Sequence, residues 1–180
     1  KDVNYIKDDG FEINALLKMF NADRPDTGGE MVRSMARVMS LLVDELEKAQ
    51  PDIVLSGFDI GANMAVTIAA AHMNIPVAHI QGGEVTGSID ESIRHAMSKF
   101  AHIHFPATEL SKQRLVRMGE ESDNIYVVGC PSIDVINETP KVDINTLEEY
   151  LNLDFSQPVL LMIQHPVTTE FGDSFLQIKE

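Results

Sequence analysis

Hydrophobic positions along the chain follow two different spacings. From Met31 to Leu46 they recur every three or four residues, which is the period of an amphipathic helix, and Pro51 ends this segment. Residues 52–55 contain instead a short apolar run of the length of a buried strand. The two patterns then alternate, predicting helices over 63–72, 90–100 and 108–118 and strands over 76–80, 102–106 and 124–128.

Strands that alternate with helices indicate an α/β fold with a doubly wound parallel sheet of Rossmann-like type, because each parallel connection needs a crossover that a helix provides. Residues 138–157 are polar and acidic with short helical character, and an apolar run over 158–164 then begins a new strand. This change predicts a first Rossmann-like domain over residues 1–155 and the start of a second over 156–180.

The net charge of the chain restricts the kinds of molecule that it can bind. The 180 residues include 28 Asp and Glu against 14 Lys and Arg, a net charge of −14, which is the wrong sign for binding nucleic acid. No run of eighteen apolar residues and no basic-then-apolar leader is present, so we expect no membrane contact and a cytoplasmic protein, in agreement with the single Cys130. The chain begins without methionine and ends inside an apparent helix start at 175–180, which predicts a fragment.

The most concentrated chemistry follows the strand over 76–80. Gly82, Gly83 and Gly87 predict a loop whose backbone can approach a ligand closely, at the carboxyl end of a parallel strand, where open α/β sheets bind their ligands. Four of the six histidines and three carboxylates lie in or soon after this loop: His79, Glu84, Asp90, Glu91, His95, His102 and His104.

Near the start of the helix over 90–100, Ser88 and Glu91 form one pair of polar residues, and Asp90 and Arg94 form another. Ser88 and Glu91 have the spacing of a capping box, and Asp90 either complements the helix dipole or faces substrate as a general acid or base. Arg94 lies one turn after Asp90. It either forms a helical ion pair, worth about 0.3–0.5 kcal/mol, or clamps a diphosphate.

The histidines indicate one shared site. His102 and His104 are two apart on a predicted strand and so share a face, and His95 lies on the preceding helix. A zinc site is disfavoured because the chain has one cysteine and no His-x-x-x-His spacing. We therefore expect no metal and no cofactor, with the imidazoles serving as proton carriers or hydrogen-bond donors.

Four motifs, over residues 79–96, 99–104, 128–132 and 164–169, resemble those of the hydrolysing UDP-N-acetylglucosamine 2-epimerases, which make N-acetylmannosamine for sialic-acid-type sugars. The string Gly-Gly-Glu-Val-x-Gly-x-Ile-Asp is typical of this branch and not of the non-hydrolysing epimerases. The resemblance implies a glycosyltransferase-B-like fold with two Rossmann-type domains facing a cleft. This chain would hold most of the first domain, without its opening strand, and the start of the second.

The resemblance also implies a reaction and a set of residues. A proton leaves sugar C2 as UDP leaves C1, and water then adds to the resulting glycal with inverted stereochemistry at C2. We expect a UDP-sugar substrate and a homo-oligomer, either a dimer or a tetramer. The residues expected to carry catalysis are Asp59, His79, Gln81, Glu84, Asp90, His102 and His104, and those expected to bind substrate are Ser92, Arg94, His95 and His165.

Two positions depart from the family pattern. Gly57 and Phe58 stand where many members carry an Asp-Arg pair, and Gln81 stands where they carry a glutamate. An amide cannot serve as a general base. Either the protein acts on a related sugar nucleotide, such as a 2,4-diacetamido sugar of the legionaminic-acid pathways, with Asp59 or Glu84 as the base, or the site is altered.

Three functions therefore remain open at this point. The favoured one is a hydrolysing 2-epimerase of a UDP- or GDP-activated 2-acetamido sugar. The alternatives are a glycosyltransferase-like enzyme on the same fold and a non-catalytic protein that binds a sugar nucleotide.

Overall fold

The computed structural model of the chain divides into two compact units, Lys1–Val128 and Gly129–Glu180, which we describe separately. The structure describes residues 2–23, 25, 27–58, 60–165, 167, 170 and 172–179, without the side chain of Asp2. Asp59, one of the candidate bases, lies outside the described residues.

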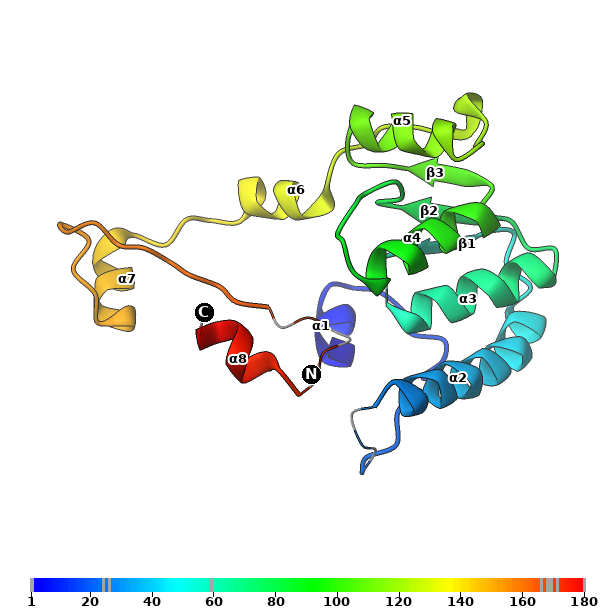
Figure 1. Cartoon of the computed structure of the whole chain (residues 1–180), viewed down its shortest axis with the longest axis horizontal. Helices are drawn as coiled ribbons and strands as arrows, with labels where there is room; N and C mark the ends of the chain where they lie inside the picture. Colours follow the sequence, from blue (N-terminus) through cyan, green and yellow to red (C-terminus); the bar gives the residue numbers. More distant parts are fainter. Residues whose placement is uncertain are drawn as a thin grey trace. The chain divides into compact units, whose positions relative to one another are not determined.

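The first unit is built on a parallel sheet. Its strands are β1 (Val54–Gly57), β2 (Val77–Ile80) and β3 (Ile103–Phe105), hydrogen-bonded in the order β1-β2-β3 (Figure 1). The register places His79 opposite Ser56 on one side and His104 on the other. All three strands therefore end at one edge of the sheet, as the alternating pattern predicts.

Helices precede, connect and follow these strands. They are α1 (Asp2–Asp8), α2 (Gly28–Ala49), α3 (Gly61–His72), α4 (Ile89–Phe100) and α5 (Glu109–Arg117), followed by the 3-10 turn η1 (Ser122–Asn124). The four helices predicted from periodicity are confirmed. The first is longer than predicted because Thr27 accepts a hydrogen bond from the Glu30 amide at its start, and Gln50 adopts a left-handed φ of 43° at its end.

Small side chains allow close packing between α3 and its neighbours. α3 contacts β1, β2, α2 and α4, and α4 also contacts β2. The buried hydrophobic side chains of the unit are Val38, Leu46, Ala65, Ala69, Ala70, Val77, Ala78, Met97, Leu115 and Ile125. The alanines of α3 let helix backbones approach the sheet and each other closely, as expected for an alanine-rich helix.

The strand predicted over 124–128 is only partly formed. Ile125 makes an isolated parallel bridge with His104, and the amides of Tyr126 and Val128 donate to the carbonyls of His104 and Pro106. The η1 turn occupies the residues just before this segment, so the regular ladder is limited to a short stretch beside β3.

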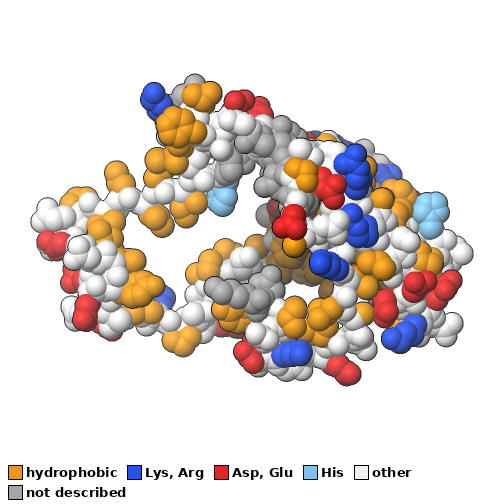
Figure 2. Space-filling model, turned by 90° about the horizontal axis from the view of Figure 1, so that it is seen from below, with side chains coloured by type: hydrophobic (Ala, Val, Ile, Leu, Met, Phe, Trp, Pro, Cys, Tyr) orange, Lys and Arg blue, Asp and Glu red, His pale blue; other side chains and the backbone are white. Residues whose placement is uncertain are grey.

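The second unit contains the short helices α6 (Pro131–Glu138), α7 (Ile144–Leu151) and α8 (Ser174–Lys179). The strand predicted over 158–164 is absent, because no other strand of this unit's described residues offers it a ladder. Leu160 and Leu161 are accordingly 96% and 84% exposed, and Figure 2 shows orange side chains along this part of the chain. The predicted domain boundary at residue 155 stays a prediction.

None of the helices in the described part of the chain is long and apolar enough to cross a bilayer.

The packing of α5 leads to a stability prediction. Leu115 is fully buried and Leu110, in the same helix, is 52% exposed. We expect Leu115→Ala to lower the free energy of unfolding by about 2–5 kcal/mol, since it leaves a cavity, and the matched Leu110→Ala to lower it by less than about 1 kcal/mol. Urea denaturation of both variants measures the difference, and equal losses would contradict the placement of α5.

Candidate active site

Two unusual backbone conformations mark the carboxyl edge of the sheet. Phe58 follows β1 with φ of 63°, and Gln81 follows β2 with φ of 59°. A left-handed conformation costs a non-glycine residue about 1–3 kcal/mol, and such residues concentrate at functional sites. These are also two of the positions at which the chain departs from the pattern of the epimerases it resembles.

The loop from residue 82 to 88 packs tightly on the protein itself. A Cβ atom on Gly82 would lie 2.9 Å from His79 Nδ1, and one on Gly83, whose φ is +81°, would overlap the Ser111 carbonyl oxygen of α5. Only Gly87, with φ of +70°, has open space around it. The sequence predicted that the loop glycines let a ligand approach the backbone. In the structure, the space beside Gly82 and Gly83 is occupied by neighbouring protein atoms.

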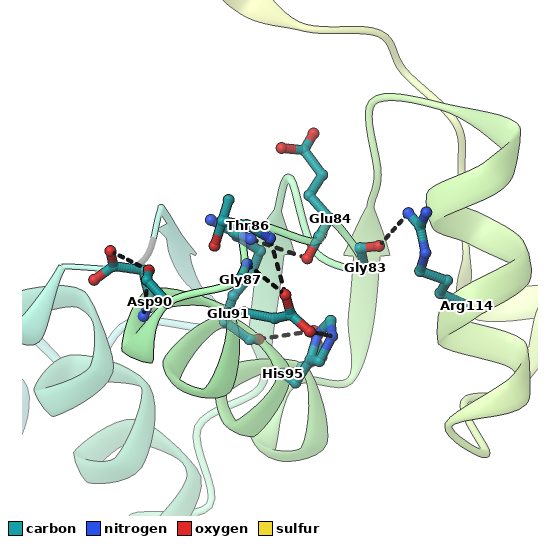
Figure 3. Close-up of polar contacts among 11 residues, drawn as sticks. Gly83, Glu84, Thr86, Gly87, Asp90, Glu91, His95 and Arg114 are labelled. Carbon is teal, nitrogen blue, oxygen red and sulfur yellow. Dashed lines mark hydrogen bonds and ion pairs between the residues drawn. The ribbon is translucent and has the colours of Figure 1, made fainter. Parts of the chain in front are cut away.

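Side chains from two helices hold the backbone of this loop (Figure 3). The Nη1 atom of Arg114 in α5 donates to the Gly83 carbonyl at 3.1 Å, and that of Arg94 in α4 donates to the Glu84 carbonyl at 2.9 Å. On the other side, Glu91 Oε2 accepts hydrogen bonds from the Thr86 and Gly87 amides, both at 2.9 Å. Side chains of α4 and α5 therefore hold the loop backbone at four residues: Gly83, Glu84, Thr86 and Gly87.

The Glu91 carboxylate is occupied by its hydrogen bonds to the loop backbone. The amides of Gly87 and Thr86 lower the pKa of its carboxyl below the usual value, because they bond to the charged form. The predicted capping box is modified: Ser88 Oγ accepts from the Asp90 amide at 3.2 Å, and Glu91 reaches past Ser88 to the loop. His95 Nε2 lies 3.8 Å from Glu91 Oε1 on the next turn.

Asp90 and Glu84 are the carboxylates directed away from this network. Asp90 is half-buried, and its Oδ2 atom accepts a hydrogen bond from Ser88 Oγ at 2.8 Å. Figure 3 shows Asp90 and Glu91 on different sides of α4 and the Glu84 side chain projecting outward from the loop. Arg94, expected either to pair with Asp90 or to clamp a diphosphate, is 6% exposed and bonds to the loop backbone. Substrate binding by Arg94 stays a prediction.

His79 and His104 lie side by side beneath the loop. They are opposite each other in the β2–β3 register, so their side chains share one face of the sheet, and they are 0% and 1% exposed. His79 Nδ1 lies 3.1 Å from Ser98 Oγ of α4. Burial, followed by the nearby His104, Arg94 and His95, lowers the pKa of His79 to about 4, so its ring is neutral at pH 7.

The Glu120 carboxylate lies between His104 and Lys99. Its Nε2 atom lies 3.3 Å from Glu120 Oε2, and Glu120 Oε1 lies 2.7 Å from Lys99 Nζ. Burial lowers the pKa of His104, and the attraction to Glu120 opposes this effect. Glu120 is not among the residues expected from the sequence, because nothing in its local pattern indicates that the turn after α5 returns to β3.

His102 lies at the opposite end of the sheet. Its amide donates to the Val77 carbonyl at 2.8 Å, and its Nδ1 atom accepts from the Val77 amide at 3.2 Å. Val77 begins β2, so His102 lies at the amino ends of the strands. His102 directly precedes β3, which begins at Ile103, and it is exposed whereas His104 is buried, so the shared site of the two histidines stays a prediction.

The remaining candidates lie on α4 and in the second unit. Ser92 is exposed on α4, His95 is half-buried beside Glu91, and His165 is exposed in the second unit outside any helix or strand. Their roles in substrate binding stay predictions. Over the described part of the chain, no group of three or more His, Cys, Asp or Glu side chains is arranged to hold a metal ion.

Comparison with known proteins identifies the family. A family profile described as UDP-N-acetylglucosamine 2-epimerase matches residues 2–180. The chain belongs to this family. It is 37% identical over 177 residues to the UDP-N,N'-diacetylbacillosamine 2-epimerase (hydrolyzing) of Legionella pneumophila, covering 98% of this chain and 46% of that protein. It is also 37% identical over 142 residues to the UDP-N-acetylglucosamine 2-epimerase of Neisseria meningitidis serogroup B, covering 79% and 37%.

A solved structure agrees with the fold of this epimerase-family chain. The UDP-GlcNAc 2-epimerase of Neisseria meningitidis, crystallised with UDP-GlcNAc, matches with a TM-score of 0.57 and 27% identity over 73% of this chain and 37% of that one. The predicted α/β class with a glycosyltransferase-B-like fold is confirmed. The chain spans less than half the length of the curated relatives it matches.

The two loop glycines provide a matched pair for testing the anchoring of the loop. Gly83→Ala forces both a left-handed alanine and an overlap with the Ser111 carbonyl, whereas Gly87→Ala has only the left-handed conformation to accommodate. We expect a loss of about 2–4 kcal/mol in the free energy of unfolding for Gly83→Ala and about 1 kcal/mol for Gly87→Ala. Denaturant titration of both variants measures this; a smaller loss for Gly83→Ala would contradict the packing.

The depressed pKa of His79 predicts a dependence of stability on pH. Between pH 6.5 and about 4 the unfolded chain binds a proton at this position and the folded chain does not, so the free energy of unfolding falls as the pH is lowered. The full effect of His79 is about 3 kcal/mol. In an NMR titration, the imidazole signal that disappears in His79→Gln should have its midpoint near pH 4. A midpoint near pH 6.5 would contradict the burial of the ring.

Proposed function

We propose that the protein to which this chain belongs is a hydrolysing 2-epimerase of a UDP-activated 2-acetamido sugar, releasing the free 2-epimer and UDP. The family match supports the epimerase chemistry. The observation that carries the hydrolysing assignment is the anchored loop over residues 82–88 with the start of α4, because the Gly-Gly-Glu-Val-x-Gly-x-Ile-Asp string over 82–90 is the one that resembles the hydrolysing branch, and the Glu84 side chain projects outward from this loop.

The proposed reaction has two stages. A carboxylate takes the proton from C2, the C1–O bond breaks with its electron pair leaving on UDP, and a C1=C2 double bond forms. Water then adds its hydroxyl to C1, while C2 receives a proton on the opposite face. Asp90 and Glu84 are the proposed acid–base pair, since both carboxylates lie at the carboxyl edge of the sheet and outside the loop anchors.

The buried imidazoles have a different proposed role. His79 and His104 are 0% and 1% exposed, so neither ring reaches a sugar in this conformation. We assign them to the support of the loop, with His79 held neutral below Gly82. His102 has no part in the proposed reaction because it lies at the amino end of the sheet.

The proposed substrate is a 2,4-diacetamido sugar nucleotide. Gln81 places an amide, which donates and accepts hydrogen bonds but takes no proton, where many members of the family carry a glutamate. The name of the Legionella pneumophila relative, a UDP-N,N'-diacetylbacillosamine 2-epimerase, supports this choice. The same amide favours the second candidate function, a sugar-nucleotide-binding protein without turnover.

Proton NMR of the full-length protein in D2O tests the proposal. With UDP-N,N'-diacetylbacillosamine or UDP-N-acetylglucosamine, we expect free UDP together with a free sugar that carries deuterium at C2. Deuterium at C2 with the sugar still attached to UDP would contradict hydrolysis. Binding without release of UDP would favour the second candidate, and UDP release only with an acceptor sugar would identify a transferase.

Two substitutions in the proposed site should differ strongly. Asp90→Asn removes a proton acceptor and should lower kcat by at least about 10²-fold, whereas Gln81→Ala should change it by less than about tenfold if the amide only orients substrate. Steady-state UDP release measures both. Near-normal turnover in Asp90→Asn would remove Asp90 from the mechanism.

A second pair of substitutions identifies the base that replaces the glutamate found at the position of Gln81 in many members of the family. If Glu84 is that base, Glu84→Gln lowers kcat by about 10²-fold and Asp59→Asn does not. The reverse result would place the base in the loop after β1.

A further inference from the structure

We propose that Arg114 of α5 is a positioning residue that directs the carboxylate of Glu84 into the reaction. This inference rests on the proposed function, in which Glu84 moves a proton. Arg114 has no place among the residues expected from the sequence, and it contributes no carboxylate or imidazole to the chemistry. Its role follows from the bond that its Nη1 atom donates to the Gly83 carbonyl at 3.1 Å (Figure 3).

Two guanidinium groups fix the peptide planes on either side of Glu84. The Gly83 carbonyl belongs to the plane that precedes the Cα atom of Glu84, and it is held by Arg114. The Glu84 carbonyl belongs to the plane that follows, and it is held by Arg94 at 2.9 Å. When both planes are fixed, φ and ψ of Glu84 are fixed, and so is the direction of its Cα–Cβ bond.

The surroundings of Gly83 make this anchor rigid. Gly83 is buried against the Ser111 carbonyl and the Leu115 side chain, which lie on the same helix as Arg114. Ser111 is itself held at the start of α5, where its amide donates to Thr108 Oγ1 at 3.1 Å. The guanidinium therefore bonds to a carbonyl that is already seated on its own helix, and the charge of arginine is permanent at every working pH.

The Glu84 side chain depends on this backbone for its position. Within the described part of the chain, no hydrogen bond or ion pair to its carboxylate is present, and Figure 3 shows it pointing away from both helices. A proton-transfer group must be held near its working geometry, and a displacement of about 1 Å can lower a rate by about 10²-fold. Loss of the Arg114 anchor should therefore appear in catalysis.

The experiment compares Arg114→Met and Arg114→Lys with the control Arg117→Met in the full-length enzyme. Arg117 is an exposed arginine one turn further along α5. We expect Arg114→Met to lower kcat by about tenfold or more with KM within about threefold, Arg114→Lys to recover part of the loss, and Arg117→Met to match the wild type. Hydrogen exchange at the amides of residues 84–87 should accelerate in Arg114→Met only.

A double-mutant cycle separates positioning from a general structural role. In a Glu84→Gln background, Arg114→Met should lower kcat by less than about threefold, because the group that it positions is already lost. An undiminished tenfold loss in that background would overturn the inference, as would full activity of Arg114→Met or of Glu84→Gln. If Arg114→Met does not fold, Arg114→Lys takes its place in the cycle.

The outcome also distinguishes this inference from the proposed function. If the wild-type protein releases no UDP from either sugar nucleotide, the proposed function itself fails. If the wild type is active and Arg114→Met is equally active, only the role of Arg114 is refuted.

Discussion

The seating of Gly83 on the backbone of α5 is the contact on which the candidate site depends. It requires a residue without a side chain and with a positive φ, and it brings Arg114 within reach of the Gly83 carbonyl. From this point the loop is held by Arg94 and Glu91 of α4, and its remaining freedom lies in the side chains that point outward. Local geometry at one glycine thus positions the backbone that carries Glu84.

Burial divides the charged and titratable groups of the site into two layers. The inner layer contains His79 and His104, whose pKa values are lowered by burial, and Glu120, which is paired with Lys99. The outer layer contains Asp90 and Glu84 at the carboxyl edge of the sheet. His79 is neutral at pH 7, whereas Arg94, which is 6% exposed, keeps a positive charge beside it and donates to the Glu84 carbonyl of the loop.

Local patterns in the sequence were sufficient to predict most of the helices and strands of the first unit. The helices from α2 to α5 follow from hydrophobic positions that recur within a few residues, and the strands follow from short apolar runs, as in β2, where three consecutive residues are buried. The prediction over 158–164 was wrong because a strand exists only beside another strand, and the described residues of the second unit provide none. Similarly, His102 lies outside β3 because the first residue of a strand depends on its neighbours.

By itself, the sequence determined the parallel α/β class, the glycine loop after β2 and the family, since these depend on short-range spacing and on motifs. Only the tertiary structure decided which groups meet. Arg114 reaches Gly83 across 31 positions of the chain, and Glu120 lies against His104 because the turn after α5 returns to β3. Such contacts join segments whose separation no local period encodes, so the two buried histidines and the two loop arginines acquire their roles only when the chain is folded.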